Sequence, residues 1–239
     1  MKAVVLAAGI GKRLKPITEN IPKVMVEINS KPLLEYLIRV LKASDLTDLI
    51  LVVGHKKEMI SNYFRDGKSF GMKIEYIDQG EYLGTGHAVL VTNGKTSKEF
   101  VVLYGDSIWT VEHIKNIIKE FRERGLDAAM SVREAPKEEL SRFGNVIVKH
   151  GLVEDMIEKP SPEKAIGNLY FTGLIVFKDE IYNYLRRIEK SPRGEYELPD
   201  AIKLMIKDEK RVGAVLADKV LDLTKQEDIE KLAREIHQI

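Results

Sequence analysis

Residues 6–25 read LAAGIGKRLKPITENIPKVM, and they begin inside an apolar run, residues 3–8, that is typical of a buried strand. Glycines at the carboxyl end of such a strand, here Gly9 and Gly11, let backbone N–H groups approach a phosphate chain. A dinucleotide-binding loop would need a third glycine where Leu14 stands, and a P-loop would need Gly-Lys-Ser/Thr. A plain Gly-x-Gly turn without a ligand is the alternative that these glycines alone leave open.

Apolar strands and amphipathic helices alternate outward from this stretch. Alternation of this kind predicts an α/β fold, a three-layer Rossmann-like, mostly parallel mixed sheet with helices on both faces. We expect one domain, residues 1–239, with a hairpin that turns at His150–Gly151. The remaining strands are expected at 49–53, 73–77, 100–104, 127–132, 145–148, 153–157, 169–177 and 212–217, and the helices at 33–41, 59–64, 111–121, 181–188, 198–206 and 227–236.

Composition excludes several classes of protein. The formal net charge is +1, from 38 basic and 37 acidic residues, so nothing in the balance indicates a nucleic acid or an anionic membrane as a partner. With no cysteine, the chain has neither disulfides nor thiolate sites. No apolar run is long enough to span a membrane or to act as a signal peptide, and we therefore expect a cytoplasmic protein. The abundance of Lys and Glu hints at a thermophilic source.

The whole of residues 6–25 is more informative than its glycines. It resembles the signature of the sugar-1-phosphate nucleotidylyltransferase family, Leu-Ala-x-Gly-x-Gly-x-Arg-Leu-x-Pro-x-Thr followed by Pro-Lys. The matching residues are Leu6, Ala7, Gly9, Gly11, Arg13, Leu14, Pro16, Thr18, Pro22 and Lys23. This resemblance implies the nucleotide-diphospho-sugar transferase fold, a nucleoside triphosphate bound by the glycine loop, and Mg²⁺ as cofactor.

Two further segments resemble nucleotide-binding parts of the family. Residues 79–88, QGEYLGTGHA, look like the base-recognition segment of uridylyl- and thymidylyltransferases. A Gln side chain offers both an acceptor and donors, which suits the imide edge of uracil or thymine. Asp106 follows a glycine at a strand's carboxyl end, as in the family's Gly-Asp metal motif. The nucleotide site implied by the resemblance comprises Leu6, Ala7, Ala8, Gly9, Gly11, Arg13, Gln79, Gly84 and Thr85.

The second half resembles the family's sugar-phosphate site. Glu158-Lys159-Pro160 matches its Glu-Lys-Pro motif, and residues 193–200, RGEYELPD, match a stretch of the glucose-1-phosphate thymidylyltransferases. The site residues so implied are Gly144, Glu158, Lys159, Asn168, Thr172 and Arg193. Asp222 resembles the late metal aspartate, and its competing interpretation is a cap for the helix that follows. The resemblance thus divides the chain into a mainly nucleotide-binding part, 1–110, and a mainly sugar-phosphate-binding part, 111–239.

The reaction that the resemblance implies needs no general base, because a sugar 1-phosphate is already anionic. Arg13, Lys23 and Asp106 would be the catalytic residues, with Mg²⁺ held by Asp106 and Asp222. UTP or dTTP would react with glucose 1-phosphate or with N-acetylglucosamine 1-phosphate, as in the uridylyltransferase domain that makes UDP-N-acetylglucosamine.

Three alternatives stay open. A cytidylyltransferase could act on another phosphate such as inositol or choline phosphate, a guanylyltransferase could act on mannose 1-phosphate, and a non-catalytic regulatory protein could share the fold. Neither nucleic acid nor membrane is expected as a partner, whereas a homo-oligomer is possible in this family.

Overall fold

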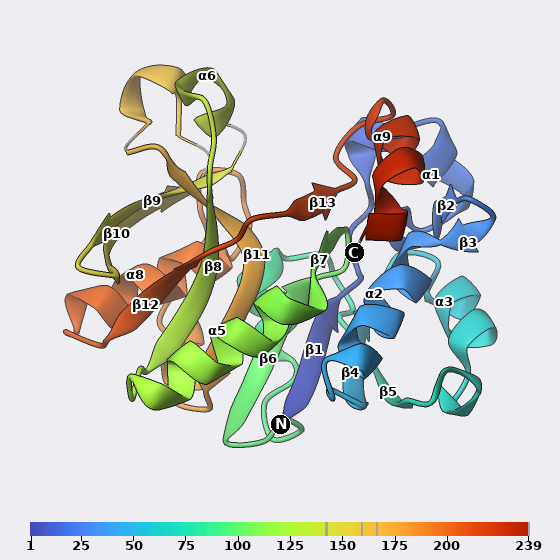
Figure 1. The fold of residues 1–239 in the computed structure, drawn as a ribbon, viewed down its shortest axis with the longest axis horizontal. Helices are drawn as coiled ribbons and strands as arrows, with labels where there is room; N and C mark the ends of the chain where they lie inside the picture. Colours follow the sequence, from blue (N-terminus) through green and yellow to red (C-terminus); the bar gives the residue numbers. More distant parts are fainter. Residues whose placement is uncertain (142, 159, 166, 239) are drawn as a thin grey trace.

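The computed structural model describes residues 1–141, 143–158, 160–165 and 167–238. Its centre is a sheet of nine strands, which Figure 1 shows with helices in front of it and behind it. In their order across the sheet, the strands are β5 (Lys73–Asp78), β4 (Asp48–Val53), β1 (Lys2–Leu6), β6 (Glu99–Tyr104), β11 (Leu169–Lys178), β8 (Ala128–Glu134), β12 (Val212–Leu216), β10 (Leu152–Glu158) and β9 (Gly144–Lys149).

The direction of the strands determines where a ligand can bind. Strands β5, β4, β1 and β6 are parallel to one another, so their carboxyl ends meet at one edge of the sheet. Strand β11 lies antiparallel between β6 and β8, so its first residues, rather than its last, lie at that same edge. The residues that follow these four strands and the first residues of β11 therefore lie close together at one edge of the sheet.

Two hydrophobic layers cover the sheet. Ala3 and Val5 of β1 pack with the helices on one face, and Val4 packs with those on the other face. The first face carries α2 (Leu33–Ala43), α3 (Lys57–Phe64), α5 (Val111–Glu123) and α9 (Asp228–Glu235), and the second carries α4 (Thr85–Leu90), α7 (Ile181–Leu185) and α8 (Leu198–Lys207). The expected three-layer fold is therefore confirmed.

Short elements complete the fold. Two small ribbons pair β2 (Glu27–Ile28) with β3 (Lys31–Pro32) and β7 (Ser107–Trp109) with β13 (Val220–Asp222). The remaining helices are α1 (Ile17–Asn20) and α6 (Lys137–Leu140), and the 3-10 turns are η1 (Lys12–Leu14), η2 (Lys23–Met25), η3 (Lys68–Phe70), η4 (Pro162–Lys164) and η5 (Ile236–Gln238). No helix in the described ranges is both long enough and apolar enough to cross a membrane.

Some strands and helices end at residues other than those that the sequence predicts. The first strand stops at Leu6 instead of residue 8, because the chain leaves the sheet for the glycine loop. The helix expected at 181–188 ends at Leu185. Helix α4 and the β7–β13 ribbon were not predicted, since each is too short to show a periodic apolar pattern.

Candidate functional site

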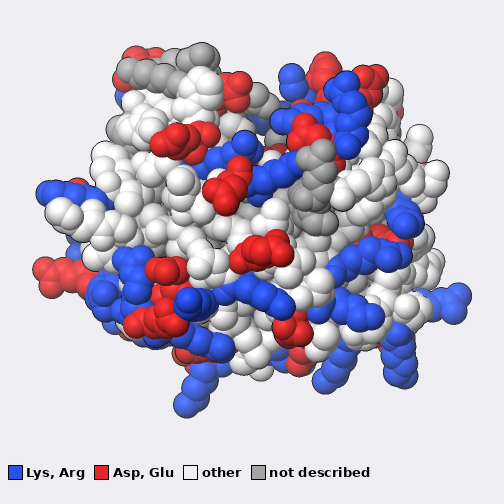
Figure 2. Space-filling model, in the orientation of Figure 1, with Lys and Arg blue, Asp and Glu red and all other residues white. Residues whose placement is uncertain are grey.

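A cavity of about 320 Å³ opens at the edge where the parallel strands end. A smaller cavity of about 100 Å³ adjoins it, and the two cavities share the lining residues Lys23, Tyr82, Tyr104 and Asp106. Figure 2 shows the molecule hollowed between the α6 and α9 regions, with acidic and basic side chains interspersed around the hollow. Predicted residues of the larger cavity are Gly11, Arg13, Lys23, Asp106, Gly144, Glu158, Thr172, Arg193 and Asp222. Those of the smaller one are Leu6, Ala8, Gly9, Lys23, Gln79, Gly84, Thr85 and Asp106.

The glycine loop is held in shape by its own turn. Gly11 has a φ of 70°, and a Cβ at that position would lie 2.9 Å from Cγ2 of Thr18. The Thr18 hydroxyl donates to the Gly11 carbonyl oxygen at 2.8 Å, which fixes the loop above η1. Arg13 lies on η1 with its side chain exposed at the larger cavity, and it forms no ion pair within the described residues. Its guanidinium is therefore available to an anionic ligand.

Lys23 and Asp106 form an ion pair where the two cavities meet. Lys23 begins η2, and Asp106 stands between β6 and β7. The Leu223 backbone N–H donates to the Asp106 carbonyl oxygen at 2.9 Å, which ties this turn to the chain beyond β13. A cation and a carboxylate are thus fixed at the junction of two ligand cavities.

Asp222 is placed beside this pair by the β7–β13 ribbon, in which it lies directly opposite Ser107. Burial raises the pKa of Asp222 to about 6, and the nearby charge of Asp106 adds to the effect. Helix α9 begins at Asp228, whose side chain accepts from the Thr224 and Lys225 backbone N–H groups, so Asp222 is not the cap of that helix.

The donor set fits Mg²⁺. This ion takes one or two protein carboxylates together with substrate phosphates, and Asp106 and Asp222 line the same cavity. No cluster of three or more His, Cys, Asp or Glu side chains suited to a metal occurs in the described part of the chain. A site for a divalent ion here would therefore depend on phosphate oxygens from the ligand.

Gln79 occupies the end of the smaller cavity, only 4% exposed. Its Nε2 donates to the Gly84 carbonyl oxygen at 2.9 Å, and this bond fixes the orientation of the amide. The Oε1 atom is buried without a hydrogen-bond partner in the described structure. Gln79 therefore presents an acceptor of fixed orientation, which a ligand N–H would satisfy.

The loops of the two cavities are hydrogen-bonded to each other. The Gly86 N–H donates to the Tyr196 carbonyl oxygen at 2.8 Å, and the Tyr196 N–H donates to Leu83 at 2.7 Å. The Thr85 hydroxyl accepts from the Leu198 N–H at 3.0 Å. The segment around Gln79 and the segment around Arg193 are thus joined into one hydrogen-bonded wall.

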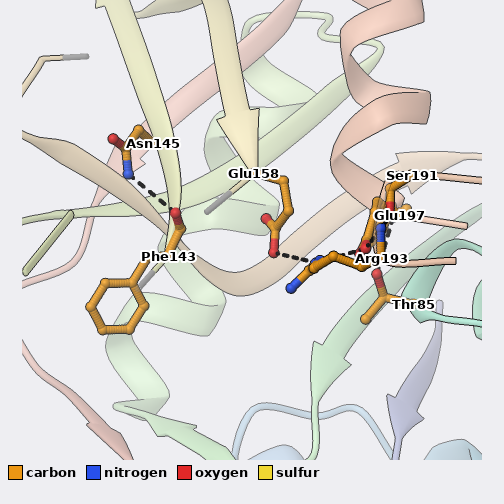
Figure 3. Close-up of polar contacts among 8 residues, drawn as sticks. Thr85, Phe143, Asn145, Glu158, Ser191, Arg193 and Glu197 are labelled. Carbon is orange, nitrogen blue, oxygen red and sulfur yellow. Dashed lines mark hydrogen bonds and ion pairs between the residues drawn. The ribbon is translucent and has the colours of Figure 1, made fainter. Parts of the chain in front are cut away.

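Arg193 lies between two glutamates at the far end of the larger cavity (Figure 3). Its Nη2 donates to Glu197 at 2.6 Å and to Glu158 at 3.4 Å. Glu197 is 3% exposed, and burial raises the pKa of its carboxyl, while Arg193 partly offsets the rise. At Gly144 a Cβ would lie 2.9 Å from Oε2 of Glu158, so this glycine leaves room for that carboxylate.

Several predicted site residues lie differently from expectation. The side chain of Ala7 is in the core, and its N–H donates to Val52, so neither is free for a nucleotide. Asn168 lines neither cavity, and its Nδ2 donates to Glu134 at 3.3 Å. Thr172 does line the larger cavity, but its hydroxyl accepts from Trp109 at 3.0 Å and donates to Ser131 at 2.7 Å. Lys159 lies outside the described residues.

The sequence interpretation missed the aromatic residues that line the larger cavity, which include Tyr82, Phe143 and Tyr170. Phe143 and Tyr170 stack with ring centroids 4.3 Å apart and form one wall. Tyr82, 41% exposed, borders both cavities. The sequence offered one signal for Tyr82, its place in a loop between Gly80 and Gly84, because binding residues often lie on loops that a rigid scaffold positions.

Behind Thr172, a buried chain of hydrogen bonds reaches His113, whose Nε2 lies 2.8 Å from the Ser131 hydroxyl. Burial lowers the pKa of His113 to about 4, against about 6.5 in an unfolded chain. The unfolded state therefore binds a proton more readily below pH 6.5, and stability falls as the pH drops towards 4.

We expect the free energy of unfolding to fall by about 2 kcal/mol when the pH is lowered from 7 to 5, because the pKa of His113 differs by about 2.5 between the folded and unfolded states. Denaturant titrations at both pH values should show a smaller loss for His113→Gln than for the wild type. The control is His150→Asn, at an exposed turn with φ 51°, and its loss should equal the wild-type loss. Equal losses in all three proteins would contradict the prediction.

Comparison with known proteins places this cavity in context. A sequence model of the family described as Nucleotidyl transferase matches residues 2–239. The chain is 37% identical over 219 residues to UTP--glucose-1-phosphate uridylyltransferase AglF of Haloferax volcanii, covering 91% of this chain and 88% of that protein. It is 39% identical over 219 residues to the bifunctional protein GlmU of Methanocaldococcus jannaschii, covering 90% of this chain and 49% of GlmU. The chain thus spans about half the length of this second relative.

Solved structures agree in fold. A UDP-glucose pyrophosphorylase complexed with UDP-glucose superposes with a TM-score of 0.88 at 24% identity, covering 99% of this chain and 98% of that one. A putative glucose-1-phosphate thymidylyltransferase from Bacillus anthracis gives a TM-score of 0.88 at 21% identity, covering 100% and 96%. At these identities the likeness establishes the fold of the sheet and its helices.

Proposed function

The chain belongs to the nucleotidyl transferase family, and on that premise we propose that it joins UTP or dTTP to a hexose 1-phosphate, with release of pyrophosphate. It is an enzyme of the sugar-phosphate nucleotidylyltransferase class. The hexose 1-phosphate is glucose 1-phosphate or N-acetylglucosamine 1-phosphate. The AglF relative, named for UTP and glucose 1-phosphate, supports the first of these.

One observation carries the proposal, which is that Lys23 and Asp106 line both cavities. A nucleotide whose base lies by Gln79 would place its phosphates at this junction. A sugar phosphate held near Arg193 would reach the junction from the other side. Two substrates, each with its own cavity, would therefore meet at a lysine and a carboxylate.

The chemistry is a phosphoryl substitution without proton transfer. An anionic oxygen of the sugar 1-phosphate attacks the α-phosphorus, and the bond between that phosphorus and the bridging oxygen of the β-phosphate breaks. Mg²⁺ held by Asp106 and Asp222 would supply positive charge to the phosphates. Lys23 holds the α-phosphate, Arg13 neutralises the departing pyrophosphate, and Arg193 orients the sugar phosphate.

The buried acceptor of Gln79 supports the choice of base. Uracil and thymine present an N–H at their imide edge, and cytosine presents an acceptor there instead. Guanine also carries an N–H, and the resemblance of residues 79–88 to the base segment of uridylyl- and thymidylyltransferases favours uracil or thymine over it.

Pyrophosphate release tests the function as a whole. The protein with Mg²⁺ is mixed with each of UTP, dTTP, CTP, GTP and ATP, and each is paired with glucose, N-acetylglucosamine or mannose 1-phosphate. We expect release to be fastest with UTP or dTTP. Absence of release with every pair would overturn the proposal and favour a non-catalytic protein on the same fold.

The Gln79→Leu variant should raise the KM for UTP about tenfold, because one hydrogen bond in a buried site contributes about 1.4 kcal/mol. The ratio of kcat/KM for UTP over CTP should fall, since the acceptor that disfavours cytosine is gone. The KM for the sugar phosphate serves as the internal control and should not change. An unaltered preference for UTP would refute the role of Gln79.

Protonation of Asp222 should weaken Mg²⁺ binding in mildly acidic solution. The pKa of this carboxyl is raised to about 6, so below pH 6 an increasing fraction is neutral. The Mg²⁺ concentration at half-maximal activity should therefore rise about tenfold for each pH unit below 6. In Asp222→Asn this pH dependence should vanish, and its persistence there would assign it to another group.

A further inference from the structure

Two buried side-chain atoms have no hydrogen-bond partner in the ranges that the structure describes. They are Nε2 of His55 and Oε1 of Gln79. Buried polar atoms in folded proteins are almost always paired, because an unpaired one loses its bonds to water without replacement. Each of these atoms therefore indicates a contact made by something other than the protein.

Both residues line one cavity of about 240 Å³. They follow β4 and β5, which are parallel neighbours, so the two side chains leave the sheet at the same edge. Gly54 and Gly80 contribute walls without side chains, and Ala8 completes the side towards the glycine loop. Ala8, Gln79 and Tyr82 also line the smaller cavity of the candidate site, so the two spaces adjoin.

We propose that His55 binds the base together with Gln79. The inference rests on the proposed function, and it names a residue that neither the family motifs nor the cavity at the catalytic junction singled out. Oε1 of Gln79 accepts from the imide N–H of uracil or thymine. Nε2 of His55, acting as an N–H donor, pairs with the carbonyl oxygen beside that N–H. One donor and one acceptor that line the same cavity match a pyrimidine imide.

The segment that carries Tyr82 borders the cavity that His55 and Gln79 line. Tyr82 is 41% exposed and lines this cavity as well as the two at the catalytic junction. It lies between Gly80 and Gly84, which have φ values of 70° and 101°. An exposed aromatic ring at the border of this cavity offers a surface on which a base can pack.

Calorimetric binding of UTP tests the inference without relying on turnover. His55→Phe keeps a ring and removes the nitrogen, and it should weaken UTP binding about tenfold. The melting temperature of the free protein should stay equal or rise, because an unpaired buried nitrogen has been removed. A nitrogen with a merely structural role would instead lower the melting temperature when removed. His55→Gln, which restores a donor, should recover most of the affinity.

Thio-substituted nucleotides identify the contacted oxygen. One of 2-thio-UTP and 4-thio-UTP should bind the wild type more weakly than UTP, and His55→Phe should not discriminate against it. His237→Phe, at an exposed histidine that lines no part of this cavity, is the matched control and should bind UTP normally.

The outcomes separate this inference from the proposed function. Unchanged UTP affinity in His55→Phe, with pyrophosphate released from UTP at the wild-type rate, would overturn the role of His55 and leave the function standing. No binding of either UTP or dTTP by the wild type would overturn both, and release from another NTP would then identify the base.

Discussion

Replacing Arg13 by alanine should lower turnover at least a hundredfold while the protein remains folded. In the proposed mechanism the departing pyrophosphate gains negative charge as the bond to the α-phosphate breaks, and the guanidinium of Arg13, exposed at the cavity, would stabilise that charge. Removing one preorganised donor of this kind costs about 2.7–4 kcal/mol, or a factor of about 10² to 10³. Since Arg13 forms no ion pair within the described residues, the melting temperature should not change.

A neighbouring lysine provides the matched control. Lys12 lines the same cavity and is also exposed, so Lys12→Ala removes an equal charge one residue away. Its effect on turnover should stay within about fivefold, because the family signature has an arginine at position 13 and no fixed residue at position 12, and an exposed charge that holds no ligand is screened by solvent. Arg13→Lys should recover only part of the rate, since an ammonium lacks the bidentate geometry. Near-normal turnover in Arg13→Ala would refute this assignment.

The sequence predicted the parts of the site that depend on the ends of regular strands. Gly11, Gln79 and Asp106 each follow an apolar run, and parallel strands bring the residues that follow them to one edge. The direction of β11 could not be predicted, because its apolar run suits either orientation. The fold class was predictable for the same reason, since alternating strands and helices leave few ways to cover a parallel sheet.

The remainder depends on contacts between distant segments. The family resemblance assigns Thr172 to the sugar site. No local pattern indicates that its hydroxyl is hydrogen-bonded to Trp109 and Ser131. Asp222 reaches the cavity through a three-residue strand paired with β7, and such a strand is too short to show periodicity. His55 stood out only when its ring nitrogen proved to be buried and unpaired.

Asp106→Asn should cause the largest loss of activity, about a thousandfold in kcat/KM. The substitution keeps the size of the side chain and removes its charge, so both partners of the carboxylate are affected. In the proposed mechanism Mg²⁺ would lose a ligand, and the charge stabilisation that a metal supplies is worth several kcal/mol. Lys23 loses the ion pair that holds it at the junction of the two cavities.

The rate measured against Mg²⁺ concentration separates these two effects. If the metal dominates, Asp106→Asn should need at least tenfold more Mg²⁺ for half-maximal activity, and Lys23→Met should reduce turnover without that shift. If the ion pair dominates, the two variants should lose activity equally, and the double variant should be no worse than either, as expected for residues that act as a unit. Asp155→Asn, the same change on β10 outside both cavities, should leave the rate and the Mg²⁺ dependence unchanged. Full activity in Asp106→Asn at low Mg²⁺ would exclude this carboxylate from the catalytic site.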